Sequence, residues 1–255
     1  MPRDTKKTGG GIRWRLWLGV AGLGIAGVST AVAGFKVRDY ALTDQQFQLS
    51  REAKDAISIQ GQNYTSRAKV LRIFSGDWGR SVFSVDLNER RRRLLAIDWV
   101  EDASVSRIWP DRLAVRIRER KPVAFVFFRS GVLLIDAHGV LLEQPPQAQV
   151  AFPVLSGVRE DETEERRRER VACLLRIQDE LGSMAKDVSE VNAADPDNIR
   201  MTVQVDRRTL ELVMGDTNFA TRYRNFISHF AEIQRRSPGA KTFDLRLADR
   251  ITAED

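Results

Sequence analysis

Residues 103–119 read ASVSRIWPDRLAVRIRE, in which two alternating runs flank a short connecting sequence. Apolar residues take every second position of the second run, from Leu113 to Ile117, and the alternate positions on and beside this run include Arg112, Arg116 and Arg118. A period of two is typical of half-buried β-strands, and the proline and aspartate of Trp109-Pro110-Asp111-Arg112 favour a turn. The stretch therefore predicts two adjacent strands with one apolar and one polar face.

The residues before this stretch predict a third strand and two helices that pack with the two strands. Ile57–Gly61 is expected to form a brief strand, and Thr65 can cap a helix that ends near Phe74. Val82–Val85 is expected to be extended, and Asp86 with Glu89 three residues later is a capping-box pattern for a second helix to about Leu95. The order strand-helix-helix-strand-strand predicts a three-stranded sheet with two helices on one face.

From Pro122 onward the pattern predicts a second, larger region of meandering strands. One-sided alternation is typical of an antiparallel sheet with one wet or polar face. Helices are expected from about Glu160 to Leu181 and from about Ala220 to Gln234. The fold class is therefore α+β. The predicted strands are 123–128, 132–135, 140–142, 199–205, 210–212 and 243–247.

The N-terminal region contains twenty consecutive residues without a charge, Leu16–Phe35. Twenty residues at helical rise span roughly 30 Å, which matches the hydrocarbon core of a bilayer. Arg13 and Arg15 precede the run, and the positive-inside rule then places the tail 1–15 in the cytoplasm and the bulk of the chain outside. We expect a single transmembrane helix, followed at 36–56 by a polar segment that forms a short linker or a helix leading away from the membrane.

Three other interpretations of this segment remain open. Ala31-Val32-Ala33 fits a cleavage site, so the segment could be a signal peptide, although its apolar core is longer than usual. Gly22, Gly24 and Gly27 match the glycine pattern of dinucleotide-binding folds, which needs a strand, a tight turn and a long helix. A plain buried core helix is the third interpretation, and the basic flank argues against it.

Composition narrows the function further. The net charge is +6, and the arginine runs 90–93 and 166–168 invite a nucleic-acid interpretation, but both lie in helix-like segments mixed with glutamate and are expected to be solvated faces. Cys173 is the only cysteine, so no internal disulfide is possible, and its apolar surroundings predict a buried thiol. Asp136 and His138 could suggest catalysis, but Gly139 after them makes a tight turn the ordinary interpretation.

A set of short motifs follows in order along the chain: Ile59-Gln-Gly61, Val82-Phe83-Ser-Val85-Asp86-Leu87, Ile97-Asp-Trp99-Val100, Ala103-x-Val105, Arg107-x-Trp109-Pro110-Asp111-x-Leu113, Glu119-Arg120-Lys121-Pro122-Val123-Ala124 and Leu134-Ile135-Asp136-x-x-Gly139. In this order the motifs resemble the bacterial FtsQ/DivIB cell-division family. The resemblance implies a POTRA domain at 57–121, an FtsQ-type β-domain at 122–252 and a short tail at 253–255. It also implies a scaffold of the divisome at the septum of the inner membrane, with no catalytic activity and no cofactor.

The resemblance also implies a partner site on the last strand. Members of the family bind an FtsB/FtsL-type coiled-coil partner there by strand addition, which an edge strand permits because its backbone groups are unpaired. The candidate residues are Phe243, Asp244, Leu245, Arg246 and Leu247, with Arg200 on a neighbouring strand; the family often has an aromatic where this chain has Leu247. An ordinary core strand that binds nothing is the alternative.

Two other functions compete with the scaffold. One is a POTRA-type chaperone for outer-membrane protein assembly, but residues 122–255 contain two predicted helices and too few strands for it. The other is a dinucleotide-binding oxidoreductase, which rests on the glycine pattern alone.

Overall fold

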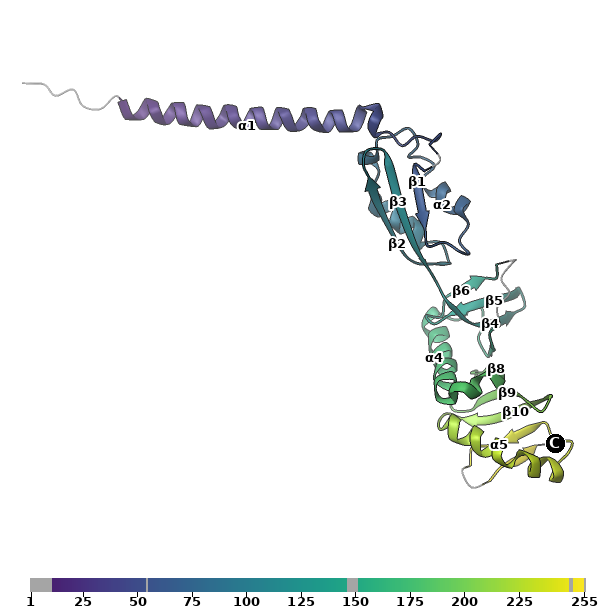
Figure 1. Cartoon of the computed structure of the whole chain (residues 1–255). Coiled ribbons are helices and arrows are strands. Elements are labelled where there is room, and N and C mark those ends of the chain that lie inside the picture. The colour runs from purple at the N-terminus through teal and green to yellow at the C-terminus, as the bar shows by residue number, and fades with distance from the viewer. Residues whose placement is uncertain (1–10, 54, 146–150, 248–249, 255) are drawn as a thin grey trace, which may run out of the picture. The chain divides into compact units, whose positions relative to one another are not determined.

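The computed structural model describes residues 11–53, 55–145, 151–247 and 250–254, with side chains described from Gly27 onward and without that of Glu254. The chain divides into two compact units (Figure 1). The first comprises residues 1–96 and 102–117, and the second comprises residues 97–101 and 118–255. Both mix helices with sheet, so the α+β class is confirmed.

The first element is one continuous helix, α1 (Gly11–Thr43). Residues 16–26 of the expected span Leu16–Phe35 lie where side chains are not described. Among the helices with described side chains, none has both the length and the apolar character that a bilayer crossing requires. The helical backbone across 22–27 contradicts the dinucleotide interpretation, which needs a strand and a tight turn there. Residues 36–43 extend the same helix, which is the helical alternative for the start of the 36–56 segment.

The first unit contains a three-stranded sheet in the order β1-β3-β2, in which β1 and β3 are parallel. The strand-helix-helix-strand-strand order is confirmed. The prediction that Val82–Val85 is extended is wrong for its first three residues, which form a 3-10 turn capped by Ser81. The elements are β1 (Ile57–Gln60), α2 (Arg67–Ile73), α3 (Leu87–Leu95), β2 (Val100–Ile108) and β3 (Arg112–Glu119).

A buried ion pair joins the loop after α2 to α3. Arg90 Nε and Nη2 donate to the two carboxylate oxygens of Asp77 at 2.7 and 2.8 Å. The Asp77 side chain is fully buried, and that of Arg90 is 12% exposed. This two-point contact satisfies both charged groups where water is excluded. Arg90, one of the arginines that invited a nucleic-acid interpretation, is therefore a structural residue of this unit.

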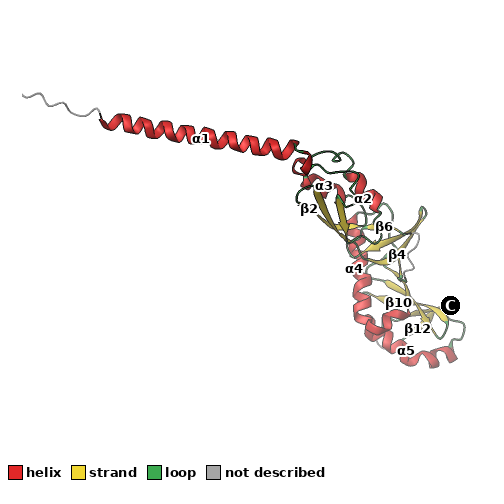
Figure 2. Ribbon diagram, turned by 45° about the horizontal axis from the view of Figure 1, so that its top comes forward, coloured by secondary structure: helices red, strands yellow, loops and turns green. Residues whose placement is uncertain are grey.

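The second unit is built on a nine-stranded sheet in the order β12-β11-β10-β9-β8-β7-β4-β5-β6. Two long helices accompany it (Figure 2). The elements are β4 (Pro122–Phe128), β5 (Gly131–Asp136), β6 (Leu141–Glu143), β7 (Val154–Ser156), α4 (Glu164–Leu181), β8 (Val188–Asn192), β9 (Ile199–Val205), β10 (Arg208–Gly215), α5 (Phe219–Arg236), β11 (Thr242–Asp244) and β12 (Thr252–Glu254).

This sheet is mixed, so the expectation of an antiparallel sheet is only partly right. The pairs β4–β7, β7–β8 and β10–β11 are parallel. The reason lies in the connections, because parallel neighbours need a long crossover. α4 provides that crossover between β7 and β8, and α5 provides it between β10 and β11.

One face of the sheet forms the apolar core with α4 and α5. Buried side chains alternate along β9, where Ile199, Met201 and Val203 face that core while Arg200 and Thr202 point away from it. The core continues through Phe226 of α5 to Phe243 of β11. The one-sided alternation of the sequence is therefore confirmed.

Candidate functional site

The candidate strand Phe243–Leu247 divides into two parts with different roles. Phe243 is 1% exposed, and its ring lies 5.2 Å from that of Phe226 on α5. Leu245 is also buried, and its N–H donates to Val213 O at 2.9 Å. These two buried side chains fix the strand to the core. They therefore position the exposed residues of the segment and do not themselves contact a partner.

The strand is not at the edge of the sheet. β12 pairs with β11 in antiparallel register, from Thr242–Glu254 to Asp244–Thr252. The prediction that 243–247 is the last, exposed strand is therefore wrong over residues 243–244, which β12 covers. The regular strand also stops at Asp244, and the register with β12 stops at the same residue.

Asp244 and Arg246 form a close ion pair at this point. Arg246 Nη2 lies 2.6 Å from Asp244 Oδ2, and Arg246 Nε donates to both carboxylate oxygens. These hydrogen bonds hold the pKa of Asp244 below its ordinary value. The Arg246 side chain is still 49% exposed, so its cationic group remains within reach of a partner.

Arg222 of α5 makes hydrogen bonds that hold the same segment in place. Its Nη2 donates to Arg246 O at 3.1 Å, and its Nη1 donates to Met214 O at the end of β10. One guanidinium therefore ties residue 246 to the neighbouring strand. Arg222 was not predicted from the sequence, where its only signal was a position on the polar side of a strongly amphipathic helix.

Arg200 lies farther from the strand than expected. It is on β9, and β10 separates it from β11, with Arg200, Val213 and Asp244 in one row of register. Its Nη1 lies 3.3 Å from Glu211 Oε1. Arg200 and Asp244 therefore share the polar face of the sheet but do not contact each other.

Leu247 is the most exposed apolar side chain of the segment, at 53%. It borders a pocket of about 350 Å³ between the start of α5 and the residues after β11. The pocket is therefore lined by both apolar side chains and polar groups, and the polar groups could orient a partner side chain. The lining residues are Asn218, Thr221, Arg222, Asn225, Leu245, Leu247 and Ile251.

The Asp136–His138 pair is structural. Asp136 is buried, accepts the N–H groups of His138 and Val140 at 2.9 and 2.8 Å, and pairs with Arg120 at 2.9 Å. Gly139 has φ +84°, and a Cβ there would lie 2.6 Å from Arg168 N of α4. The predicted turn is confirmed, and the carboxylate is fully used in shaping it.

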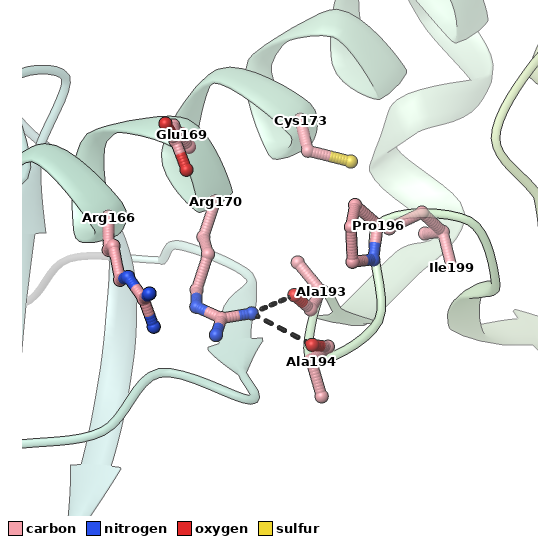
Figure 3. Close-up of a pocket in the computed structure, with 8 residues that line it drawn as sticks. All are labelled: Arg166, Glu169, Arg170, Cys173, Ala193, Ala194, Pro196 and Ile199. Atoms are coloured by element: carbon pink, nitrogen blue, oxygen red, sulfur yellow. Dashed lines mark hydrogen bonds between the residues drawn. The ribbon is translucent and has the colours of Figure 1, made fainter. Parts of the chain in front are cut away.

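A separate pocket of about 250 Å³ lies beside Cys173 (Figure 3). Arg170 crosses it to donate to Ala193 O and to Ala194 O, and its Nη2 pairs with Glu162 at 2.7 Å. Burial raises the pKa of the Cys173 thiol, and nearby Arg176 offsets only part of that rise. The thiol is therefore protonated and a poor nucleophile at neutral pH. Among the described residues no group of His, Cys, Asp and Glu has a metal-binding arrangement.

Comparison with known proteins identifies both units. A family model described as "POTRA domain, FtsQ-type" matches residues 55–120, and one described as "Cell division protein FtsQ/DivIB, C-terminal" matches residues 124–246. A cell division protein FtsQ from Koribacter versatilis is 35% identical over 228 residues, covering 87% of this chain and 66% of the relative.

Other relatives carry the same description. One from Syntrophotalea carbinolica is 26% identical over 260 residues, covering 96% of this chain and 89% of the relative. One from Zymomonas mobilis is 36% identical over 102 residues, covering 40% of this chain and 32% of the relative. The chain thus spans two thirds or less of the Koribacter and Zymomonas proteins. With both family models matched in order, the chain belongs to the FtsQ/DivIB family of bacterial cell-division proteins.

Proposed function

We propose that this chain is a non-enzymatic scaffold of the bacterial divisome, held in the inner membrane by α1. Its two units lie outside the cytoplasm at the division septum and recruit other division proteins. The observation that carries the proposal is family membership together with a sheet end that leaves charged and apolar side chains exposed around Arg246 and Leu247.

The anchor rests on the sequence and on the helix that contains it. α1 has 33 residues, which corresponds to roughly 50 Å at helical rise and exceeds the hydrocarbon thickness. The uncharged run Leu16–Phe35 is flanked by Arg13 and Arg15 on the side assigned to the cytoplasm. Protease added to intact spheroplasts should digest residues beyond 43; full protection would contradict this topology.

The partner we propose is an FtsB/FtsL-type coiled-coil protein that continues into an extended segment. The segment pairs with the backbone along 243–247, while Asp244, Arg246 and Leu247 contact its side chains and Arg200 lies farther along the same polar face. Strand addition supplies backbone hydrogen bonds, and the exposed charges set the register. Phe243 and Leu245 act through the core, because both are buried.

The segment takes the place of β12. β12 pairs with only three residues of β11. A partner strand that continued along Leu245–Leu247 would add three more positions, worth roughly 0.6–3 kcal/mol at roughly 0.2–1 kcal/mol for each cross-strand pair. Pairing at Arg246 requires its N–H to leave Asp244 Oδ1, to which it donates at 2.9 Å. Against this stands the cost of moving Ile251 and Ala253, which pack on the core.

The direct test of the site is charge reversal, Arg246→Glu, in a binding titration with the coiled-coil partner. We expect the dissociation constant to rise about tenfold or more, equivalent to roughly 1.4 kcal/mol, because the new carboxylate repels Asp244 and any acidic partner group. Arg236→Glu is the matched control, since Arg236 is an exposed arginine paired with Glu232 on α5. Unchanged affinity for Arg246→Glu, with an unchanged melting temperature, would refute the site.

The displacement of β12 has its own test. A chain that ends at Leu247 lacks β12 and should bind the partner at least as tightly as the full chain. A large loss of affinity in a shortened chain that still melts cooperatively would show that β12 itself is the template for the partner strand.

A further inference from the structure

An aromatic cluster lies where α1 ends. The ring of Phe47 is its centre, with ring centroids 5.7 Å from Tyr40, 5.4 Å from Phe83 and 6.0 Å from Trp109. The members come from the last turns of α1, the 3-10 turns at 45–47 and 82–84, and the turn after β2. Segments distant in sequence therefore place their aromatic side chains at one point of the first unit.

Only the centre of this cluster is buried. Phe47 is 5% exposed, whereas Trp109 is 71% exposed, and Tyr40, Phe83 and the adjacent Ile108 are exposed as well. Packing in the first unit therefore accounts for Phe47 alone. The outer members leave exposed apolar side chains around Phe47 at the end of the helix, and exposed apolar side chains gathered at one place mark a contact site.

Specific contacts fix this surface to the helix end. Ser81 Oγ donates to Ala41 O at 2.7 Å, and Gln46 Nε2 donates to the Tyr40 hydroxyl at 2.5 Å. Arg107 donates to the carbonyls of Val82 and Val85 at 2.7 and 2.8 Å, which holds the turn that carries Phe83. The aromatic surface is thus attached to α1 by side-chain hydrogen bonds as well as by ring contacts.

Its distance from the uncharged segment matches the depth of the headgroup layer. Tyr40 lies five residues beyond Phe35, or about 7.5 Å along a helix. The polar layer on each side of the hydrocarbon core is roughly 5–8 Å thick. Tyr40 therefore reaches the membrane–water interface, where tyrosine and tryptophan are enriched in membrane proteins. Trp109 contacts the ring of Phe47, which in turn contacts the ring of Tyr40.

The charges around the surface nearly balance. In the sequence, Lys36, Arg38, Arg107 and Arg112 stand within four residues of Tyr40 or Trp109, and so do Asp39, Asp44 and Asp111. This mixture gives little net attraction for acidic lipids, so the attraction to the membrane comes mainly from partition of the aromatic side chains into the interface.

We propose that Tyr40, Phe83, Ile108 and Trp109 form a lipid-docking surface that rests on the phospholipid interface of the bilayer spanned by α1. Docking holds the first unit against the membrane and limits its rotation about the helix end. The inference rests on the proposed anchor, because α1 sets the depth of the surface.

The test uses the full chain in nanodiscs of zwitterionic phosphatidylcholine, with Cys173→Ser and single nitroxide labels. The probe is Ile108→Cys, which retains Trp109. Val28→Cys on α1 reports the anchor, and Phe127→Cys in the second unit is a matched exposed apolar position. Accessibility to oxygen and to a water-soluble nickel chelate is measured by power saturation. We expect the Ile108 label to fall between the two references, and Trp109→Asp to shift it to the Phe127 value.

Each other outcome is decisive. A lipid-exposed Val28 label with an Ile108 label like that of Phe127 would overturn the docking surface and leave the anchor intact. An aqueous Val28 label would overturn both. An Ile108 label shielded from oxygen and nickel alike would indicate a protein contact, and an interfacial position that requires acidic lipid would contradict aromatic partition; either result overturns the proposal.

Discussion

The two units expose different kinds of side chain. The first exposes apolar side chains, with Trp109 and Phe83 at the end of α1, while its charged pair Asp77–Arg90 is buried. The second buries Phe243 together with the aromatic residues of α5, and it leaves a short strand and the charged pair Asp244–Arg246 at the end of its sheet. Exposed apolar side chains can contact a lipid surface without a fixed geometry, whereas the backbone of a strand binds a partner segment in one defined register. The contrast predicts which changes disturb each unit.

The largest expected effect is removal of the apolar support of the second unit. Phe243→Ala should lower the free energy of unfolding of that unit by about 3–5 kcal/mol, because it removes a buried ring that packs on Phe226. Partner affinity should fall as well, since the strand detaches. Leu247→Ala is the control on an exposed side chain and should leave the melting temperature nearly unchanged.

The first unit should depend instead on its buried charges. Asp77→Ala should cost about 3 kcal/mol, at the lower end for a broken buried pair, because Arg90 retains some exposure. Chemical denaturation measures the loss, and the double variant with Arg90→Leu should recover part of it. If Asp77→Ala alone left the free energy of unfolding unchanged, the ion pair would not stabilise this unit.

A smaller effect is expected where the second unit brings a turn against a helix. Gly139→Ala should destabilise by roughly 1–3 kcal/mol, because the residue has positive φ and its Cβ would meet the backbone of α4. Gly131→Ala is the matched control, with φ +143° and open space around the added carbon. Equal losses for the two variants, measured by thermal melting, would mean that the close approach to α4 is unimportant.

The smallest effect is the pH dependence of the exposed charged pair. Because Arg246 holds the pKa of Asp244 below its ordinary value in the folded chain, the carboxylate stabilises at neutral pH. That contribution is lost as the pH falls through the folded pKa. It should stay below about 1 kcal/mol because the pair is partly exposed. Asp244→Asn should cost this amount at about pH 7 and progressively less as the pH falls below the ordinary range of an aspartate; a constant difference would exclude ionisation as its cause.

Alternation in the sequence predicted the elements that have enough residues to show a period. Leu113, Val115 and Ile117 are buried on β3 as expected, and the 199–205 strand and both long helices of the second unit lie where they were predicted. The three-residue strands β7 and β12 show no period, so nothing local reveals them. The parallel pairs were not predicted because they depend on where α4 and α5 cross, which alternation does not encode.

The candidate site was predicted in composition more than in geometry. The sequence places Asp244 and Arg246 on one side of a strand, and they do pair. It does not show that β12 covers the edge, because the covering residues follow a break in regular structure. It also does not show Arg222, whose contact with Arg246 O joins residues far apart in the chain.

The parallel pairing of β10 and β11 has a consequence for the timing of assembly. β11 can join the sheet only after α5 has crossed back over the core, so it enters late and by a long-range contact. A surface on β11 therefore does not exist in a half-folded polypeptide. Recruitment through it would act as a checkpoint, engaging only those copies whose second unit has completed folding.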